Sequence, residues 1–386
     1  MNHIRQHAFF IITLAILFTR IGFGLAADAK LPFIVRTIYF KPVGAPAAPK
    51  IIPKLMKETQ AFFASEMVRH GFEPKTFRLE TDAQGEVIVH TLNGRGETWE
   101  YLNSTSEKIA EETPAEFQNP NMVHVFFLGG LKNVHNNACG LGSSITGGVC
   151  GGNAFIPATG HCFSLKTIAH ELGHTFGLWH ELANTQAIMT QAAIGDEFQY
   201  FECRWLDKQH YFNDVHAINS VPKILRIHSL KHVEDHPHAF VEFNVEVESI
   251  NPLHQFHILG AGNNGVLGWT EIQGKRDTAR VLARRAWLKN YDQVAFQVLD
   301  AQGNHLMEYT HFRLPSLNPI PAENKNTDIV DEKTTQPIGK ETIKPEKPEP
   351  IEKEKVKKEN PNPEKQTPHD INAHRKFILL WAEVKR

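Results

Sequence analysis

The sequence predicts an α/β layer that is followed by a smaller, mostly β unit and then by a disordered tail. Between residues 31 and 219, segments with strand character alternate with segments of helical spacing, as in strands and helices packed in layers. From 221 to 314, apolar and polar residues mostly alternate, which indicates strands with one buried face. From about residue 315 the composition changes to Pro, Lys, Glu, Asn and Thr. We therefore expect three regions of different structure.

The composition is that of a folded protein without an overall charge field. The 386 residues are 41% hydrophobic and 22% charged, which is enough apolar surface for a core. Lys plus Arg number 41 and Asp plus Glu 43, so the formal net charge is -2. We expect no nucleic-acid partner, because no basic surface of the whole chain would hold one. The 22 histidines draw attention to metal binding and proton transfer.

Residues 1–27 have the features of a secretory signal peptide. A basic start is followed by an apolar run from Ala8 to Phe18 and then by small residues, including Ala26 and Ala27. A membrane anchor is the alternative, but a span needs about 20 apolar residues and Arg20 interrupts this run. We expect cleavage near Ala26 or Ala27, no membrane span afterwards, and a secreted, cell-surface or periplasmic protein.

Export would place the cysteines where disulfide bonds persist. They are Cys139, Cys150, Cys162 and Cys203. We favour a bond between Cys139 and Cys150, which would close the glycine-rich segment between them. The alternative is that two or more are free buried thiols, because a sequence does not fix connectivity.

The first folded region, residues 28–219, is predicted element by element. Its elements are a strand at 34–40, a helix at 51–70, strands around 76–79 and 86–92, a helix at 97–111 and a strand at 122–128. A glycine-rich segment at 140–152 follows, and it lacks the Gly-Lys-Ser/Thr ending of a nucleotide-binding loop. We expect it to be a flexible loop or the rim of a cleft.

The second region, residues 220–315, is predicted to be a small β-sandwich. Residues 240–248 alternate apolar and polar side chains, and so do residues 294–298 before a turn at 301–304. Residues 277–288 could instead form one helix. The His236-Pro237-His238 sequence has no further ligand residues at metal-binding spacing, so we interpret it as a surface turn.

The tail divides into a linker and a short apolar end. Residues 316–370 are rich in Pro, Lys and Glu and cannot bury enough apolar surface to order themselves. Residues 371–386 contain an apolar group from Phe377 to Trp381 between basic residues. This end is too short to cross a bilayer, and it is either a docking segment for a surface partner or a sticky tail.

The segment from Thr167 to Glu181 contains the candidate catalytic residues. His170 and His174 are four residues apart, so on a helix their imidazoles lie on one face about 6 Å apart and can share one ion. Glu171 is rotated by about 100° around the helix axis, which places it beside the ion. That is the position of a base acting on water bound to the metal.

A third ligand requires the helix to end. If the helix continued, His180 would lie about 9 Å further along the axis than His174 and could not reach an ion with bonds of about 2.1 Å. Gly177 lies between them, and glycine adopts the positive φ that ends helices. We therefore expect a turn at Gly177 that brings His180 back to the metal.

The residues from His170 to His180 resemble the zinc-binding signature of metzincin metallopeptidases. The sequence Ala187-Ile-Met189-Thr190 resembles their Met-turn, closest to the matrixin form. This resemblance implies a zincin-like catalytic domain with a mixed sheet and an active-site helix. It also implies Zn²⁺ as the cofactor, His170, His174 and His180 as metal ligands, Glu171 as the catalytic general base, and Met189 as an apolar floor below the metal.

The function implied is that of a secreted zinc endopeptidase, which hydrolyses peptide bonds with a metal-bound water and Glu171 as general base. A protein or peptide substrate would lie extended along an edge strand near 153–157, with S1′ walls from 194 to 201. Matrixins follow the methionine with Tyr-Pro, whereas this chain has Thr190-Gln191, so stabilisation of the oxyanion would rest on zinc.

Two other functions are compatible with the same residues. One is a surface binding or adhesion protein in which the β unit binds and the zinc site is vestigial, although the intact Glu171 argues against it. The other is a zinc amidase acting on cell-wall bonds. Digestion of casein or of a peptidoglycan fragment would separate these functions.

Overall fold

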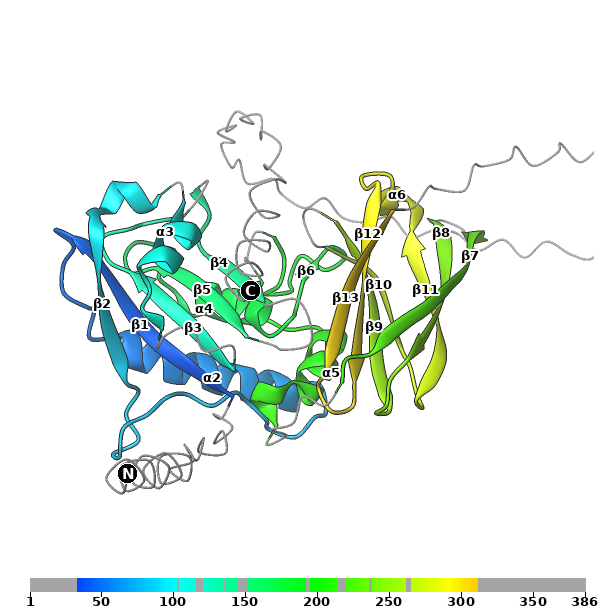
Figure 1. Ribbon diagram of the computed structural model, residues 1–386, viewed down its shortest axis with the longest axis horizontal. Coiled ribbons are helices and arrows are strands. Elements are labelled where there is room, and N and C mark those ends of the chain that lie inside the picture. The colour runs from blue at the N-terminus through cyan, green and yellow to red at the C-terminus, as the bar shows by residue number, and fades with distance from the viewer. Residues whose placement is uncertain are drawn as a thin grey trace, which may run out of the picture.

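The computed structural model describes residues 33–102, 104–115, 121–134, 137–144, 151–191, 195–213, 220–235, 238–261 and 265–311. Figure 1 shows two lobes side by side, one with helices around a sheet and the other built of strands. No helix in these ranges is long and apolar enough to cross a membrane. The predicted signal peptide, linker and C-terminal docking segment lie outside the described residues.

The N-terminal lobe contains a mixed sheet of the predicted kind. Its strands are β1 (Ile34–Val43), β2 (Val89–Glu97), β3 (Met122–Leu128), β4 (Leu141–Ser144) and β5 (Gly152–Pro157). They lie in the order β2-β1-β3-β5-β4. All neighbours pair in parallel except β4, which is antiparallel to β5. The strand predicted at 122–128 is thus confirmed at those residues.

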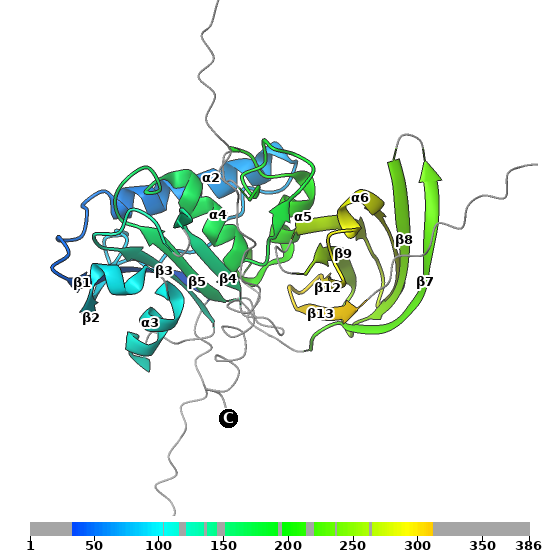
Figure 2. The same cartoon turned by 90° about the horizontal axis from the view of Figure 1, so that it is seen from above.

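Helices cover both faces of this sheet (Figure 2). Helices α2 (Ile52–Arg69) and α4 (Leu165–Thr175) lie on one face, where alternate β3 residues such as Val125 and Phe127 join the core. The short helix η1 (Thr98–Tyr101) and α3 (Thr105–Glu112) lie on the other face, over Phe126 and Leu128. The helix predicted at 97–111 is therefore divided in two, because Ser104 has a non-helical φ of -139° and begins α3 as its N-cap.

The edge of the sheet differs from the prediction. Residues 153–157 belong to β5, which is an inner strand, and the edge strand is β4. The glycine-rich segment at 140–152 therefore begins as a strand and not as a loop. The Leu-Gly-Ser-Ser sequence of this strand does not predict strand structure, because its small residues give no alternation of apolar and polar side chains.

The disulfide bond also differs from the prediction. Cys139 is bonded to Cys162, with their Cα atoms 4.8 Å apart, and Cys203 is a free, buried thiol. The antiparallel pairing of β4 with β5 explains this bond. It brings the start of β4 beside the end of β5, close to the residues that lead into α4. The expected pairing of Cys139 with Cys150 is wrong, and Cys150 itself lies outside the described residues.

The C-terminal lobe consists of two sheets around a common core. Its strands are β7 (Lys223–Asp235), β8 (His238–Glu248), β9 (Leu253–Gly260), β10 (Gly265–Glu271), β11 (Arg276–Arg284), β12 (Gln293–Asp300) and β13 (His305–His311). One sheet has the order β11-β8-β7 and the other β13-β12-β9-β10-β6. The last strand, β6 (His180–Glu181), comes from the N-terminal lobe. A separate β-sandwich domain at 220–315 therefore stays a prediction.

Two predictions for this lobe, a possible helix at 277–288 and a turn at 301–304, can be compared with the structure. The alternative of one helix at 277–288 is wrong except for the short α6 (Arg285–Leu288), because Ala279, Val281 and Ala283 alternate into the core as β11. The turn predicted at 301–304 is confirmed as the connection between the antiparallel β12 and β13. Helix α5 (Tyr200–Lys208) lies between the lobes (Figure 1) and is followed by the short helix η4 (His210–Phe212).

Candidate metal centre

Helix α4 carries the first two histidines as predicted. It begins after Ser164, whose Oγ accepts a hydrogen bond from the Thr167 amide at 3.3 Å. Its apolar side, with Ile168 and Leu172, packs into the core of the N-terminal lobe. His170 and His174 lie on the same face, and their Nε2 atoms are 3.1 Å apart. The helix thus places both imidazoles at one point.

The turn predicted at Gly177 is present. Gly177 has a φ of +87°, and the Leu178 amide donates to the Gly173 carbonyl at 2.9 Å, which closes the end of the helix. The chain then runs into β6, and the Nε2 of His180 lies 3.2 Å from the Nε2 of His174. The structure therefore brings the three predicted histidines together.

The geometry of the three imidazoles fits a metal ion. Ligand atoms of all three lie within 4.8 Å of one another. Zinc–nitrogen bonds of about 2.0–2.1 Å in a tetrahedral site separate the ligand nitrogens by about 3.3 Å, close to the 3.1 and 3.2 Å found here. The three histidines can therefore form a metal site.

Backbone carbonyls orient two of the rings. His170 Nδ1 lies 2.7 Å from the Ile188 carbonyl, and His174 Nδ1 lies 3.0 Å from the Leu178 carbonyl. A carbonyl only accepts, so both Nδ1 atoms carry the proton and both Nε2 lone pairs point to the common centre. This is the tautomer in which Nε2 is free to bind a metal.

The segment predicted to be a Met-turn lies directly below α4. Met189 is fully buried, and a Cβ atom added to Gly173 would overlap its Sδ atom. The carbonyl of Ile188 orients His170, and the carbonyl of Met189 accepts from the Glu181 amide at 2.8 Å. This turn therefore supports both the helix and the strand that carry the histidines.

Glu171 is buried beneath the edge strand β4. Burial raises the pKa of its carboxyl to about 8, and a hydrogen bond from the Gly142 backbone opposes this shift. A Cβ atom at Gly140 would overlap the Glu171 carboxylate, and one at Gly142 would overlap the Glu171 carbonyl. Sequence reasoning missed both glycines. Their signal is the alternation of Gly140 and Gly142 in a segment that the sequence predicts to be a flexible loop or the rim of a cleft.

A second group of potential ligands is not a metal site of this structure. Cys139, His161 and Cys162 lie within the same distance of one another, but the two cysteines share the disulfide bond. Cysteine binds metals as a thiolate, and a sulfur in a disulfide bond is not a thiolate. The predicted S1′ segment is described only from Gly195 onward, so its role stays a prediction.

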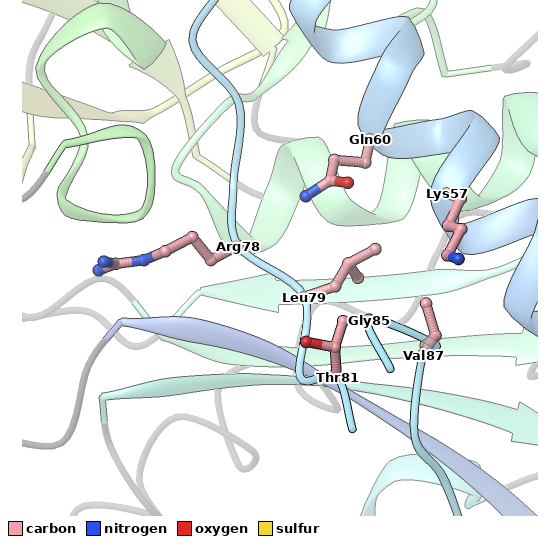
Figure 3. A pocket seen from close by; sticks show the side chains of 7 residues that line it. All are labelled: Lys57, Gln60, Arg78, Leu79, Thr81, Gly85 and Val87. Carbon is pink, nitrogen blue, oxygen red and sulfur yellow. The ribbon is translucent and has the colours of Figure 1, made fainter. Parts of the chain in front are cut away.

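A hollow of about 390 Å³ lies elsewhere, between α2 and residues 78–87, which follow it and form only isolated β-bridges (Figure 3). It is lined by Lys57, Gln60, Arg78, Leu79, Thr81, Gly85 and Val87. None of the three clustered histidines lines it. Lys57 is paired with Glu86 at 3.0 Å, so its charge is already balanced. This hollow is separate from the candidate metal centre.

Comparison with known proteins supports the resemblance. A model of the reprolysin-like M12B metallopeptidase family matches residues 88–181, less than half of the chain, and this match ends at β6. Among curated proteins, none matches the chain.

Solved structures of OgpA from Akkermansia muciniphila share the fold. Two crystal structures of the wild-type protein are 15% identical, with a TM-score of 0.53, and cover 72% of this chain and 93% and 92% of theirs. A third, of catalytically inactive OgpA with an O-glycopeptide (glycodrosocin) substrate, is 13% identical, with a TM-score of 0.52, and covers 73% of this chain and 93% of its own.

These findings define a class of protein. The family match over residues 88–181 and the cluster of three imidazoles support a zinc metalloendopeptidase, and the solved structures share its fold.

Proposed function

We propose that this chain is a secreted zinc endopeptidase of matrixin-like type. His170, His174 and His180 would hold the metal, and Glu171 would act as general base. The observation that carries this proposal is the convergence of the three Nε2 atoms at separations of 3.1 and 3.2 Å, with Glu171 on the same helix. A polar helix face without a ligand would not require a turn that returns His180 to it.

The zinc ion, when bound, would polarise the scissile carbonyl and lower the pKa of a water molecule from about 16 to about 7. The protein's own groups transfer the proton and orient the metal ligands. In its ionised form, Glu171 would take a proton from the attacking water and pass it to the nitrogen of the leaving amine. The carbonyls of Ile188 and Leu178 hold the imidazoles of His170 and His174 in place throughout.

The substrate would bind as an additional strand. β4 is at the edge of its sheet, and its backbone covers Glu171 through Gly142. An extended peptide that pairs with β4 would therefore pass close to the proposed base. The segment from 194 to 201 would form the walls of the S1′ pocket. Supporting this, Phe198 is buried beside Phe63 in the core, which gives the part of the segment around Phe198 a fixed position.

Proteolysis of casein or gelatin by the purified protein is the decisive experiment. The proposal requires cleavage that a chelator abolishes and that Zn²⁺ restores, and it requires loss of cleavage in Glu171→Ala. Intact proteins together with cleavage of a peptidoglycan fragment would favour the cell-wall amidase instead. If neither is cleaved although zinc is bound, the protein has a binding role.

O-glycopeptides are a second candidate substrate, because the neighbouring OgpA was crystallised with one. Matched peptides with and without a single O-linked glycan would decide between general and glycan-dependent cleavage. Equal rates would support a general endopeptidase, and cleavage of only the glycosylated peptide would narrow the substrate class.

The same proposal includes export of the chain. We propose that residues 1–27 are a signal peptide and that residues 371–386 dock on a surface partner. N-terminal sequencing of protein recovered from outside the expressing cell should find a start near Asp28. Retention of Met1 on the mature protein would contradict the predicted cleavage.

A further inference from the structure

The turn that returns His180 to the metal centre is held by three hydrogen bonds to successive carbonyls. Trp205 Nε1, on α5, donates to the Phe176 carbonyl at 3.0 Å. Gln297 Nε2, on β12, donates to the Gly177 carbonyl at 3.1 Å. His174 Nδ1 donates to the Leu178 carbonyl at 3.0 Å. The middle bond comes from the C-terminal lobe, more than a hundred residues away in the sequence.

Gln297 belongs to a buried chain of side-chain hydrogen bonds. Its Oε1 lies 3.2 Å from His257 Nδ1, and His257 Nε2 lies 2.8 Å from Gln255 Nε2. Gln255 Nε2 also lies 2.9 Å from the carbonyl of Phe201. Gln255, His257 and Gln297 are each at most 1% exposed, so these contacts lie away from bulk solvent.

The direction of this chain is fixed by its chemistry. An amide nitrogen only donates, so Gln255 donates to His257 Nε2, and His257 must carry its proton on Nδ1. That proton goes to Gln297 Oε1, which leaves the amide N–H of Gln297 facing the Gly177 carbonyl. Reversing the Gln297 amide would lose both bonds. The network therefore keeps the amide N–H of Gln297 directed at the Gly177 carbonyl in the turn.

The C-terminal lobe also pairs with the backbone of the third histidine. β10 pairs in parallel with β6, with Gly265 opposite His180 and Val266 opposite Glu181. β9 pairs with both β10 and β12, so the strand beside His180 and the strand that carries Gln297 belong to one sheet. The position of His180 therefore depends on this sheet at two points, the Gly177 carbonyl within the turn and the backbone of β6 after it.

We propose that Gln297 is a positioning residue of the metal centre. Its amide fixes the Gly177 turn and thereby sets His180 at the right distance from His170 and His174. The C-terminal lobe is thus part of the metal centre and is more than a separate binding module. This inference rests on the proposed function only in taking the three histidines as metal ligands.

The test is metal affinity, measured on the full mature chain. Gln297→Leu removes the donor and leaves the buried Gly177 carbonyl without its partner. We expect a loss of about 10- to 100-fold in Zn²⁺ affinity by competition with a chromophoric chelator, as for other residues that orient metal ligands. With Co²⁺ in place of zinc, the visible absorption bands should shift, which a general loss of stability would not produce.

Val298→Ala is the matched control. Val298 is the next residue of β12 and is equally buried, but it packs in the core of the C-terminal lobe. It should lose stability and keep its Zn²⁺ affinity and Co²⁺ spectrum. Should Gln297→Leu not fold, Gln297→Asn keeps the amide but is one methylene too short to reach the turn, and the same loss of affinity is expected.

His180→Ala separates the two possible failures. If the wild type binds Zn²⁺, His180→Ala does not, and the Gln297 variants bind like the wild type, the metal centre stands and the role of Gln297 is refuted. If the wild type binds no better than His180→Ala, the proposed metal centre fails and the inference with it.

Discussion

At the scale of single residues, the candidate centre depends on where protons lie on imidazoles. Backbone carbonyls fix the Nδ1 protons of His170 and His174, so neither ring has to change its tautomer before it binds a cation. The carbonyls belong to the turn after α4 and to the segment below it. The two ligands are therefore oriented by backbone carbonyls of the folded chain.

His180→Ala and Glu171→Ala should have different effects on the metal although both strongly reduce proteolysis. His180→Ala removes a ligand, so zinc and activity are lost together. Glu171→Ala leaves the three imidazoles unchanged, so the protein should keep its zinc while proteolysis falls by about 100-fold or more, the usual contribution of a general base. Metal content by atomic absorption and casein hydrolysis, measured on the same samples, check this prediction.

His228→Ala is a suitable control for both variants. His228 is exposed on β7, where it contacts Glu246 at 3.1 Å in the C-terminal lobe. It should retain zinc and activity. Full turnover by Glu171→Ala would refute the role of the glutamate, whatever its metal content.

The metal ligands could be predicted from the sequence because local spacing determines them. His170 and His174 share a helix face, and Gly177 ends the helix before His180. Gln297 could not be predicted in this way. Its partner is the carbonyl of Gly177, and the pairing depends on how two lobes pack, which no local pattern encodes.

At the scale of elements, the turn after α4 requires glycine for two separate reasons. Gly177 has a φ of +87°, and an added Cβ would lie 3.1 Å from Trp205 Nε1. Gly71, after α2, has a φ of +82° with nothing within 4 Å of an added Cβ. Both positions have a positive φ, which a residue with a Cβ atom adopts only at a cost. Only at Gly177 would the added Cβ atom also crowd a neighbouring side chain.

Gly71→Ala should therefore lose about 1 kcal/mol of stability, and Gly177→Ala clearly more. The second variant should also bind zinc more weakly, because it displaces the turn that leads to His180. Urea denaturation of the two variants and chelator competition provide the measurements. Equal losses of stability, with unchanged zinc affinity, would show that crowding at Trp205 has no effect.

The edge strand β4 packs closely against α4 at Gly142. A Cβ at Gly142 would overlap the backbone carbonyl of Glu171, so Gly142→Ala must push β4 away from α4. We expect kcat/KM for peptide hydrolysis to fall by about tenfold or more, since small displacements of a catalytic group are costly. Ser143→Ala in the same strand should remain near wild type. Wild-type kcat/KM in Gly142→Ala would show that β4 does not set the position of Glu171.

The predictable elements were those with a strong period. α2 and β3 follow from apolar spacing, and the structure has them at Ile52–Arg69 and Met122–Leu128. β4 has small residues in place of an apolar period, and its strand state comes from pairing with β5. The disulfide of Cys139 with Cys162 depends on that same pairing, so it could not be predicted before β4 was known.

At the scale of the whole molecule, the two lobes are joined by polar groups as well as by apolar packing. α5 lies between them, and Trp205 contacts the rings of both His257 and His305. His254 Nε2 lies 3.0 Å from the Arg204 carbonyl, across the same junction. Sequence analysis gave these histidines no role, because their burial arises only when the lobes meet.

Because these histidines are buried, they make the stability of the folded chain depend on pH. Burial lowers the pKa of His254 and of His305 to about 4, and that of His257 to about 3, from an ordinary value of 6.5. Above pH 7 the imidazoles are neutral in both the folded and the unfolded chain, so they contribute no pH dependence. Below pH 6.5 these imidazoles become protonated in the unfolded chain but stay neutral in the folded chain. Stability should therefore fall as the pH decreases from about 6.5 towards 4.

His254→Gln isolates one of these groups, because glutamine can still donate to the Arg204 carbonyl but does not titrate. Each buried imidazole weakens the folding equilibrium by up to about tenfold per pH unit in this window. The variant should therefore lose less stability than the wild type between pH 6.5 and 4 in urea denaturation with a chelator present. Buried Glu202, whose pKa is raised well above its usual value, acts in the opposite direction, but equally in both proteins. Parallel curves for the two proteins would mean that His254 is hydrated or already protonated in the folded state, and that the junction between the lobes is more open than its packing implies.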